Sequence, residues 1–550
     1  MTKRADILNQ PVPSVTERRR TIEAEPLPAN IAVLLEEAAD AARDRLAWNF
    51  FESGEQATYG EVRERVDALA RGLLARGVRK GVHVGVMLPN IAAFPLSWLA
   101  IGTIGAVMVP INVTYREREL AYVLNDSEAE FLILHETARD VYERARAGGS
   151  IALPAERVLL VDGAAGPYTA FRDAFEPGSE PFTAPEPVGH ADLLNIQYTS
   201  GTTGFPKGCL LTQEYWIIAG KVNARRDGRA YERILASTPF FYMDPQWLLL
   251  MTLYQRGTLF VAERQSATRF MGWVREHAIN FCLLPLLVFK QPPHPDDRRN
   301  AVVRANMYGV PRDLHAAVEE RFDLFAREAF GMTELGPTMF MPIEAVDKVG
   351  SGSCGVPGPF RECRVVDEQG DTVPAGAFGE LVVRGRGIFK GYYNRPEATA
   401  DAFFGEWFRT GDVFQRDRDG YFSILGRTKD MIRRSSENIA AREVEAVLQG
   451  AREVVEAAVV PVPDEVRGEE IKAYLVLEPG SAGDEAALAS IIAHCRANLA
   501  PFKVPRFYEF RPDLPKTASN KIAKHRLTAE LPDLRLGSYD RVAGAWLEAS

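Results

Sequence analysis

Hydrophobic and polar positions alternate with two different periods in the first half of the chain. Between residues 61 and 76 the apolar positions recur at helical spacing, and they are Val62, Val66, Leu69, Ala70 and Leu73. This spacing predicts an amphipathic helix. A further helix is predicted over 117–125, and a short apolar run predicts a strand over 129–134. Repeated alternation of strands and helices is typical of a doubly wound α/β core.

A long uncharged stretch runs from Val84 to Tyr115 and is long enough to suggest a membrane span. Proline and asparagine residues interrupt it. The pattern instead predicts a buried strand over 84–88, a buried helix over 91–103 and a second strand over 106–110. Strands that are buried on both faces are typical of parallel sheets. We therefore expect no membrane span.

The pattern changes in the second half of the chain. Residues 350–391 are rich in glycine, valine and turn residues, which predicts a small antiparallel barrel or sheet. After Gly426 an α/β pattern returns, with a helix over 441–449, strands over 454–462 and 471–477, and a helix over 484–499. A chain of 550 residues exceeds what one hydrophobic core supports. We place a domain boundary at residue 429, which gives domains of 1–428 and 429–550.

Composition narrows the class of protein. Apolar residues make up 46% and charged residues 25%, as in soluble globular proteins. The net charge of −9 argues against a nucleic-acid partner, which normally requires a basic face. The five cysteines are far apart and include no C-x-x-C, so the chain has no signature of a disulfide framework or a zinc site. Together with a polar N-terminus that lacks a secretory segment, this predicts a cytoplasmic protein.

The most informative motif spans residues 198–208 and reads Y-T-S-G-T-T-G-F-P-K-G. Gly201 and Gly204 permit close backbone approach to a ligand. The loop also carries hydroxyl donors and a mobile cation: Ser200, Thr202, Thr203 and Lys207. Successive backbone N–H groups in such a loop form a concavity for phosphate oxygens. The loop departs from the Walker pattern at Pro206 and Gly208, and strand-like apolar runs before and after it favour a polyphosphate site over a flexible surface loop.

A second motif, F-G-M-T-E over residues 330–334, ends in a carboxylate at a predicted strand end. Taken alone, a single glutamate there is more often solvated or ion-paired than a metal ligand. The combination of an aromatic ring, a hydroxyl and a carboxylate nevertheless suits a nucleotide. The ring would stack on a base, the hydroxyl would contact a phosphate, and the carboxylate would hold Mg²⁺, which prefers oxygen ligands.

Three further segments are predicted turns with charged ends. R-T-G-D at 409–412 ends in a carboxylate that suits ribose hydroxyls, although an aspartate in a turn usually bonds its own backbone. G-R-T-K-D at 426–430 is either part of a binding site or a solvated interdomain turn. P-K-T-A-S-N-K-I at 515–522 is a tight turn in which Asn520 suits a left-handed conformation, and it would aim Lys521. An exposed lysine otherwise faces solvent.

Together with other segments, these motifs make nearly the whole chain resemble the adenylate-forming superfamily, which includes acyl-CoA synthetases, luciferases and the adenylation domains of peptide synthetases. No single motif is highly specific, but their number, order and spacing are. The further matching segments are T-Y-G-E-V, G-A-V-M-V-P-I-N, G-E-L-V-V-R-G, G-Y-Y-N-R-P-E-A-T and S-E-N-I-A-A-R-E-V-E.

The resemblance implies a fold and a set of ligands. The fold is α/β: a large N-terminal domain of doubly wound α/β subdomains plus a small β-barrel over 1–428, which binds ATP and the acyl group, and a small mobile α+β lid over 429–550. The cofactors are ATP, Mg²⁺ and coenzyme A. The substrate is a small carboxylic acid, and a homodimeric assembly is left open.

The resemblance also implies roles for individual positions. The phosphate-binding residues are Thr199, Ser200, Gly201, Thr202, Thr203, Gly204 and Lys207. The remaining nucleotide-site residues are Gly309, Val310 and Pro311 (matching a Gly-Ala-Pro strand that lines adenine), Phe330, Gly331, Met332, Thr333, Asp412 (for the ribose), Arg427 and Lys429 (at the hinge). Glu334 and Thr202 would hold Mg²⁺, and Lys521 would act with them in catalysis.

The implied reaction has two steps. A substrate carboxylate attacks the α-phosphorus of ATP while Lys521 bridges the two anions, and pyrophosphate leaves. The small domain then swings about Lys429 and presents the face that carries Ser435, Ser436 and Glu437. A thiol, that of coenzyme A, attacks the activated carbonyl in this second step.

Several positions depart from the family's pattern. They are Asn520 for a glycine, Lys524 for an arginine, Ser436 for a glycine, and Gln213 and Tyr242 for histidines. The segment M-D-P-Q at 243–246 is similar to crotonobetaine/carnitine-CoA ligases. Asp244 would then face a cationic or polar acyl group, or would cap a helix at Pro245. The candidate acyl pocket comprises Tyr242, Asp244, Gln246, Trp247, Tyr308, Gly336, Pro337 and Met339.

Three functions remain open from the sequence. The first is an ATP-dependent acyl-CoA ligase. The second is an adenylation enzyme that loads a carrier protein. The third is a nucleotide-binding homologue that has lost turnover, which the departures at Tyr242, Ser436 and Lys524 would explain.

Overall fold

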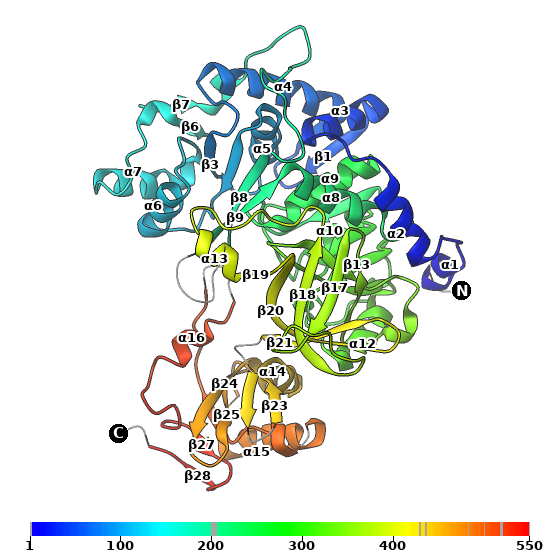
Figure 1. Cartoon of the computed structure of the whole chain (residues 1–550), viewed down its shortest axis with the longest axis vertical. Coiled ribbons are helices and arrows are strands. Elements are labelled where there is room, and N and C mark those ends of the chain that lie inside the picture. The colour runs from blue at the N-terminus through cyan, green and yellow to red at the C-terminus, as the bar shows by residue number, and fades with distance from the viewer. Residues whose placement is uncertain are drawn as a thin grey trace. The chain divides into compact units, whose positions relative to one another are not determined.

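The computed structural model describes residues 3–199, 206–427, 431–434, 437–481, 483–499, 501–517 and 521–548. The chain divides into two compact units. The first unit contains Met1–Thr199, Pro206–Glu362 and Arg384–Phe403, and the second contains Cys363–Val383 and Phe404–Ser550. Figure 1 labels the elements of both units.

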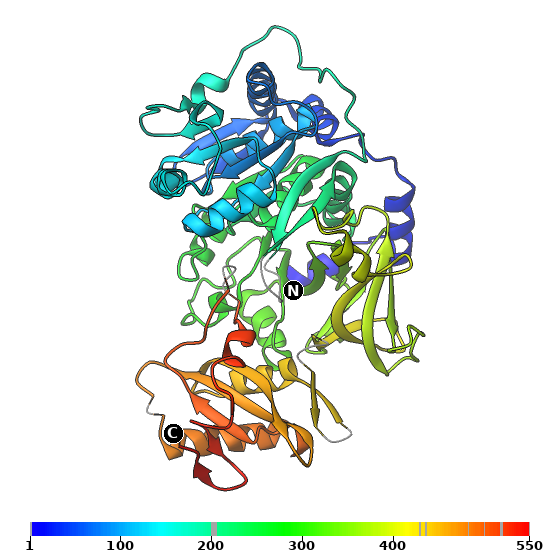
Figure 2. The ribbon, with the colours of Figure 1, turned by 60° about the vertical axis from the view of Figure 1, so that its left-hand side comes forward.

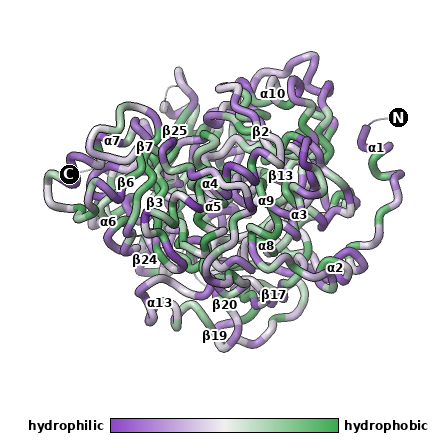
Figure 3. Tube along the Cα trace, turned by 90° about the horizontal axis from the view of Figure 1, so that it is seen from above, coloured by the Kyte–Doolittle hydropathy of each residue, from purple (hydrophilic) through white to green (hydrophobic). Residues whose placement is uncertain are grey.

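The first unit contains a seven-stranded sheet whose strands are parallel except for its last pair. Its order is β7 (Thr169–Ala170), β6 (Val158–Val161), β5 (Phe131–His135), β3 (His83–Met87), β4 (Val107–Pro110), β8 (Leu193–Thr199) and β9 (Lys207–Thr212). The accompanying helices are α4 (Tyr59–Ala75), α5 (Ala93–Ile104), α6 (Glu117–Asp126) and α7 (Arg139–Ala147). Figure 3 shows the hydrophobic colour at β3, where every residue after His83 is buried.

Local sequence explains where these helices begin. Thr58 is the N-cap of α4: its hydroxyl accepts a hydrogen bond from the Glu61 backbone N–H, and the Glu61 carboxylate accepts one from the Thr58 N–H. This reciprocal arrangement satisfies two N–H groups that a helix start leaves free. In the same way the Thr212 hydroxyl accepts from the Tyr215 N–H and begins the helix that follows β9.

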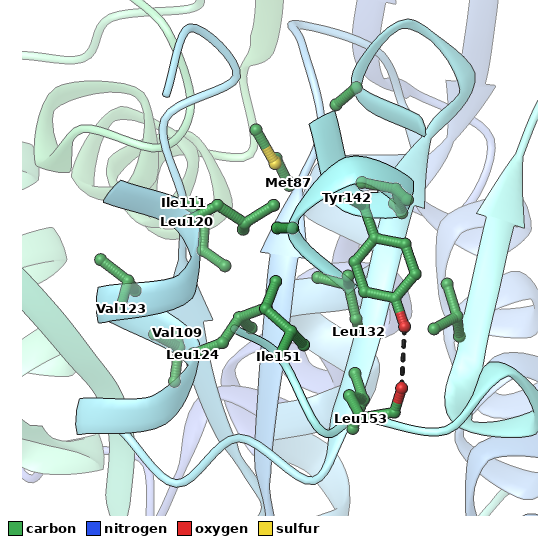
Figure 4. Close-up of a cluster of buried hydrophobic side chains, with 14 of the residues drawn as sticks. Met87, Val109, Ile111, Leu120, Val123, Leu124, Leu132, Tyr142, Ile151 and Leu153 are labelled. Carbon is green, nitrogen blue, oxygen red and sulfur yellow. Dashed lines mark hydrogen bonds between the residues drawn. The ribbon is translucent and has the colours of Figure 1, made fainter. Parts of the chain in front are cut away.

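One hydrophobic core of the first unit lies between this sheet and the helices α6 and α7. It joins Leu120 and Leu124 of α6 to Tyr142 of α7 and to Leu132 of β5. Figure 4 shows these side chains, with the Tyr142 hydroxyl donating to the Leu153 carbonyl over 3.0 Å. Each large apolar side chain buried here contributes about 1.5–3 kcal/mol.

A second sheet of the first unit carries most of the candidate site. Its order is β16 (Ser353–Pro357), β15 (Gly336–Phe340), β14 (Phe325–Met332), β13 (Arg304–Met307), β12 (Phe281–Leu283), β10 (Arg233–Ala236), β11 (Thr258–Val261), β1 (Leu46–Phe50) and β2 (Glu55–Thr58). The strands from β14 to β1 are parallel, and those at both ends are antiparallel. The other helices of this unit are α1 (Lys3–Leu8), α2 (Val15–Ala24), α3 (Ile31–Ala42), α8 (Gln213–Arg225), α9 (Met243–Gln255), α10 (Phe270–Glu276), α11 (Leu286–Phe289), α12 (Arg312–Phe322) and α13 (Pro396–Asp401).

The second unit contains two sheets. One runs β17 (Arg361–Val366), β18 (Phe378–Gly385), β20 (Trp407–Arg416) and β21 (Phe422–Arg427). The other runs β23 (Glu437–Ala440), β22 (Met431–Arg434), β25 (Gly468–Leu477), β26 (Phe507–Phe510), β27 (Tyr539–Asp540) and β28 (Ala545–Trp546), with β24 (Val454–Asp464) also paired to β25. Its helices are α14 (Ala441–Gly450), α15 (Glu485–Asn498) and α16 (Lys524–Leu527).

Side-chain alternation along β24 gives this second sheet two buried faces. Ala457 and Val459 pack with residues of α14 and α15, whereas Ala458 and Val460 pack with Leu527 of α16. Alternate residues of a strand point to opposite faces. Figure 2 shows α14 and α15 in the yellow-to-orange part of the ribbon, together with the orange strands of this sheet.

The predicted elements are confirmed over most of the chain, including the strand, helix and strand within residues 84–110. No helix within the described ranges is long and apolar enough to cross a membrane. Two local predictions are wrong. Residues 409–412 lie inside β20 and do not form a turn, because they pair with β18 and β21. Residues 309–311 do not form a strand and instead connect β13 to α12.

Candidate active site

The glycine-rich motif is carried by a hairpin. Strands β8 and β9 are antiparallel, and their register places Thr199 opposite Lys207. The apolar runs before and after the motif are therefore strands, as predicted. The remaining predicted phosphate-binding residues lie outside the described residues; they are Ser200, Gly201, Thr202, Thr203 and Gly204.

A strap of chain over residues 389–393 pairs with β9 beside this hairpin. The Lys390 N–H donates to the Leu210 carbonyl, and the Leu210 N–H donates to the Gly391 carbonyl, each over 2.9 Å. Tyr392 of the strap lies in a β-bridge with Cys209. Its ring faces Lys207, whose Nζ lies 4.9 Å from the ring centroid. A lysine ammonium over a tyrosine ring is an attractive cation–π contact.

The Glu334 carboxylate meets this strap. Glu334 lies in the turn between β14 and β15 and is 8% exposed. Its Oε1 accepts a 2.9 Å hydrogen bond from the Tyr392 hydroxyl, and its carbonyl accepts from the Phe389 N–H over 2.8 Å. Tyr392 thus connects Lys207 with Glu334. Sequence reasoning missed Tyr392, although its segment G-Y-Y-N-R-P-E-A-T was recognised.

The donor set around Glu334 fits Mg²⁺. Among the described residues no group of three or more His, Cys, Asp or Glu side chains could hold a metal ion. Mg²⁺ is usually held by one or two carboxylates, with waters and substrate phosphates completing its shell. One carboxylate beside the phosphate-loop hairpin matches that pattern, whereas a metal caged entirely by protein would need more ligands.

Strand β14 positions the other residues of the F-G-M-T-E motif. Phe330, Gly331 and Met332 are its last residues, and they pair with β15. The Thr333 carbonyl accepts a 2.9 Å hydrogen bond from the hydroxyl of Tyr215 on α8. Burial raises the pKa of Tyr215 well above its ordinary value, so its hydroxyl stays protonated and remains a donor.

The segment 309–311 is held by a carboxylate that sequence reasoning did not identify. Glu328 of β14 accepts hydrogen bonds from the Gly309 N–H (3.1 Å) and the Val310 N–H (2.5 Å). Gly309 has a φ of +69°, which favours glycine. Pro311 occupies the N-cap position of α12. The acidic residue inside the apolar strand F-A-R-E-A-F was the available signal for Glu328.

On the acyl side, the start of α9 is a hydrogen-bonded unit. Asp244 accepts from the Trp247 indole N–H over 3.1 Å. The predicted capping role of Asp244 is wrong, because Tyr242 occupies the N-cap position and Asp244 lies inside the helix. Gln246 is fully buried; its amide donates to the Tyr242 carbonyl over 3.2 Å and accepts from Asn195 over 2.9 Å. Gln246 therefore holds the segment that carries Tyr242.

The other predicted acyl-pocket residues differ in exposure. Tyr308 follows β13 and is 54% exposed. Met339 lies on β15 opposite Phe330 and is buried. Gly336 has a φ of +67°, and a Cβ there would lie 3.3 Å from the Tyr215 hydroxyl. Tyr308 thus has an exposed surface, whereas Met339 is buried and Gly336 lies against Tyr215.

Within the second unit, Asp412 lies on β20 opposite Arg427 of β21. Asp412 is 2% exposed, and its N–H donates to the Thr410 hydroxyl over 3.1 Å. Gly411 has a φ of +67°, and its N–H donates to the Glu380 carboxylate over 3.1 Å. A glycine in this conformation makes β20 irregular next to Asp412. The same glycine gives the segment R-T-G-D the appearance of a turn in the sequence.

Lys521 is hydrogen-bonded to Thr517. The Thr517 N–H donates to the Lys521 carbonyl over 2.7 Å, and the Lys521 N–H donates to the Thr517 hydroxyl over 3.2 Å. Lys516 and Ile522 form a β-bridge just outside this pair. The Lys521 side chain is exposed. Backbone hydrogen bonds thus hold the chain at the exposed Lys521, while Asn520 lies outside the described residues.

Two departures from the family pattern have structural roles. Gln213 is buried: its amide donates to the Gly102 carbonyl over 3.1 Å and accepts from the Ile31 N–H over 3.0 Å, which ties α8 to α5 and α3. Lys524 forms a 2.6 Å ion pair with Glu445 of α14. The predicted residues Lys429, Ser435 and Ser436 lie outside the described residues.

Comparison with known proteins identifies the family. Residues 35–393 match the AMP-binding enzyme family, and residues 443–521 match the AMP-binding enzyme C-terminal domain. The crotonobetaine/carnitine–CoA ligase of Salmonella paratyphi A is 33% identical, covering 90% of this chain and 98% of its own. A feruloyl-CoA synthase of Amycolatopsis is 36% identical, with 86% and 93% covered.

Solved structures share the fold. The anthranilate CoA ligase AuaEII in complex with anthranoyl-AMP superposes with a TM-score of 0.82 at 24% identity, covering 94% of this chain and 98% of its own. ATP-bound MatB from Rhodopseudomonas palustris has a TM-score of 0.78 at 25% identity, with 90% and 98% covered.

The chain therefore belongs to the AMP-binding enzyme family. Within that family it is an acyl-CoA synthetase of the adenylate-forming superfamily, that is, an AMP-forming acid–thiol ligase.

Proposed function

We propose that this enzyme activates a carboxylic acid with ATP as an acyl-adenylate, releases pyrophosphate, and transfers the acyl group to coenzyme A. The observation that carries the proposal is the connection of Lys207 and Glu334 through Tyr392, beside the hairpin of the glycine-rich loop. A cation and a carboxylate side by side suit the oxygens of a magnesium polyphosphate.

In the first step the protein mainly positions and neutralises charge, because phosphoryl and adenylyl transfer require little covalent chemistry from it. ATP and Mg²⁺, when bound, supply the activated phosphorus and the charge that offsets its oxygens. Lys207 and residues 199–204 hold the β- and γ-phosphates, and Glu334 with Thr202 holds the metal. The adenine lies against residues 309–311, which Glu328 holds, and against Phe330.

The second domain supplies the remaining groups. We place its boundary between residues 428 and 429, with Lys429 as the hinge. Asp412 binds the ribose hydroxyls and Arg427 lies nearby. Lys521 bridges the substrate carboxylate and the α-phosphate, which removes the repulsion between two anions. Its exposed side chain, on a backbone that is hydrogen-bonded to Thr517, supports this role.

In the second step the domain turns about Lys429. It withdraws Lys521 and presents Ser435, Ser436 and Glu437 to the adenylate. The thiol of coenzyme A then attacks the activated carbonyl, and AMP leaves.

The acyl group occupies the space beside Tyr308, between the Tyr242 end of α9 and the Gly336 end of β15. The segment M-D-P-Q resembles the crotonobetaine/carnitine-CoA ligases, one of which is 33% identical to this chain. We infer a compact acid as the substrate.

The test measures both half-reactions on one panel of short, aromatic and betaine-like acids. We expect pyrophosphate release that requires both acid and ATP, followed by a CoA thioester. A thioester on a phosphopantetheinylated carrier protein in place of CoA would support carrier loading instead. ATP binding without adenylate from any acid would contradict the ligase function.

Location and assembly are finer proposals. Cys209, Cys282 and Cys495 are free thiols, which suits the reducing cytoplasm. We propose a cytoplasmic enzyme with no nucleic-acid partner, in keeping with its net charge of −9. A homodimer is the assembly to be tested by sedimentation velocity.

A further inference from the structure

Arg226, at the end of α8, is a buried cation that makes no direct ion pair with a carboxylate among the described residues. Its side chain is 2% exposed. Its Nη2 donates to Oδ1 of Asn306 over 3.2 Å, and its guanidinium lies 5.5 Å from the ring centroid of Phe340. Its Nε has no hydrogen-bond partner among the described residues. Its hydrogen bond and its ring contact are thus both with neutral groups, although the charges of Arg304 and Asp227 lie close enough to act on it. Such an arrangement is unusual for a buried arginine.

A second buried guanidinium lies beside it. Arg304 of β13 is fully buried, and its Nε donates to the same Asn306 oxygen over 2.7 Å. Its Nη1 pairs with Asp227 over 2.9 Å, while its Nη2 has no partner within the described part of the chain. The other Asp227 oxygen accepts from the Tyr231 hydroxyl over 2.7 Å. The direct contacts of Asp227 are therefore with Arg304 and Tyr231, and its charge acts on Arg226 only through space.

The pair lies directly beneath the exposed part of the acyl site. Alternate residues of a strand share one face and lie about 7 Å apart. On β13 and its continuation, these residues are Arg304, Asn306 and Tyr308. Tyr308 is 54% exposed at the carboxyl end of the strand, where ligands of α/β sheets bind. Asn306 and Arg226 form the next layer inward.

The electrostatics of this layer favour an acceptor. Burial, and then the neighbouring Arg304, lower the pKa of Arg226 to about 10, and the nearby Asp227 offsets part of this effect. Arg226 remains charged at neutral pH, and a buried charged donor such as its Nε is destabilising when it lacks a hydrogen-bond acceptor. An oxygen anion placed against its Nε would recover that loss.

We propose that Arg226, with Arg304 behind it, binds an oxygen acceptor at the end of the acyl group remote from the reacting carboxylate. A second carboxylate is the best match, and a phenolic hydroxyl is a weaker one. A quaternary ammonium group would be repelled by Arg226. This assignment of the substrate class rests on the proposed ligase function. The opposing hypothesis, a cationic acyl group facing Asp244, is weakened by the Trp247 hydrogen bond that already engages Asp244.

The test compares matched acids on the wild-type enzyme. One series is cinnamate with a 4-carboxylate, a 4-hydroxyl, a 4-trimethylammonium group or no substituent, and a six-carbon aliphatic series carries the same ends. We expect kcat/KM to be at least about 10-fold higher for the 4-carboxylate than for the unsubstituted acid of the same series, which corresponds to 1.4 kcal/mol. A preference for the unsubstituted or the ammonium acid would overturn the proposal. The absence of thioester with every acid would instead overturn the ligase function.

The Arg226→Met variant then tests whether Arg226 causes the preference for acids that carry an oxygen acceptor. We expect it to lose the preference for acceptor-bearing acids while its KM for ATP stays unchanged. Arg225→Met, at the neighbouring exposed position, is the matched control and should retain the wild-type preference. An Arg226→Met enzyme that melts like the wild type and keeps the preference would contradict the proposal. If this variant does not fold, Arg226→Lys is the alternative. It keeps the positive charge but loses the planar guanidinium donors, so it should reduce the preference. The comparison of acids on the wild-type enzyme tests the proposal without any variant.

Discussion

The hydroxyl of Tyr392 donates a 2.9 Å hydrogen bond to Oε1 of Glu334. The two residues are 58 positions apart, and the same tyrosine ring lies beneath the Lys207 ammonium. The uncharged side chain of Tyr392 thereby orients both the negative charge of Glu334 and the positive charge of Lys207. The geometry of the proposed metal site depends on this tyrosine.

The Tyr392→Phe variant tests that dependence. It keeps the ring under Lys207 and removes only the hydrogen bond to Glu334. A hydrogen bond to a charged group contributes about 1.5–3 kcal/mol, so we expect the Mg²⁺ concentration for half-maximal adenylation to rise about 10-fold. The KM for the acid should not change. The measurement is pyrophosphate release as a function of Mg²⁺, and EDTA should abolish it in both enzymes.

Tyr393→Phe is the matched control for this experiment. The Tyr393 hydroxyl also donates to a carboxylate, that of Glu128 over 2.8 Å, but on the exposed surface. Its loss should leave the Mg²⁺ dependence unchanged. An equal shift in both variants, or none in Tyr392→Phe, would exclude the positioning role.

The Lys521→Ala variant should separate the two half-reactions, adenylate formation and thioester formation. Removing one preorganised charge at a reacting phosphate costs on the order of 10²–10³ in rate. We therefore expect adenylate formation to fall by that factor while thioester formation from a supplied acyl-adenylate continues. Lys503→Ala, which removes a surface ion pair with Glu443 in the same unit, should behave like the wild type. Unchanged adenylation in Lys521→Ala would refute the assignment.

His315 makes the first unit sensitive to acid. The Gly350 N–H donates to its Nδ1 over 3.1 Å, so Nε2 carries the proton and donates to the Ala326 carbonyl over 2.7 Å. Burial lowers the pKa of His315 below its ordinary value of 6.5. The unfolded chain therefore binds a proton more readily, and the contribution of His315 to stability is full above pH 6.5 and decreases as the pH falls.

We accordingly expect the melting temperature to fall between pH 7.5 and 5.5. At pH 7.5 His315→Gln should lose about 1–3 kcal/mol of the free energy of unfolding, because hydrogen bonds are lost, and should therefore melt at a lower temperature. Its melting temperature should depend less steeply on pH than that of the wild type. His525→Gln, at an exposed position, should keep the wild-type slope. If the melting temperatures of the wild type and of His315→Gln fall equally with pH, another group is responsible for the pH dependence.

Gly355 should be the least replaceable glycine near the site. It lies on β16 with a φ of +98°, and a Cβ there would come within 2.0 Å of the Phe340 carbonyl oxygen. We expect Gly355→Ala to cost about 3–5 kcal/mol, because the backbone of β15 has to move. Gly54 has a φ of +80° but open space around its Cβ position, so Gly54→Ala should cost only about 1–2 kcal/mol. Thermal unfolding of the two variants separates the steric clash from backbone strain.

Local patterns in the sequence were sufficient for most of the fold. The helix at α4 follows from its apolar spacing and from Thr58 and Glu61, which interact within one turn. The strands around the glycine-rich loop follow from short apolar runs. The errors in predicted backbone structure at 309–311 and 409–412 arose where glycines in left-handed conformations accompany a connection or an irregular strand.

The sequence by itself determined the order of the elements and the family, because periodicity, turn residues and motif spacing act over a few neighbouring residues. It also predicts the positions that would bind a nucleotide. Only the tertiary structure decided which side chains support those positions. Tyr392 reaches Glu334 across 58 residues, and Arg226 reaches Asn306 across 80. Contacts at such separations are set by sheet register and helix packing, which bring together residues that no local pattern links.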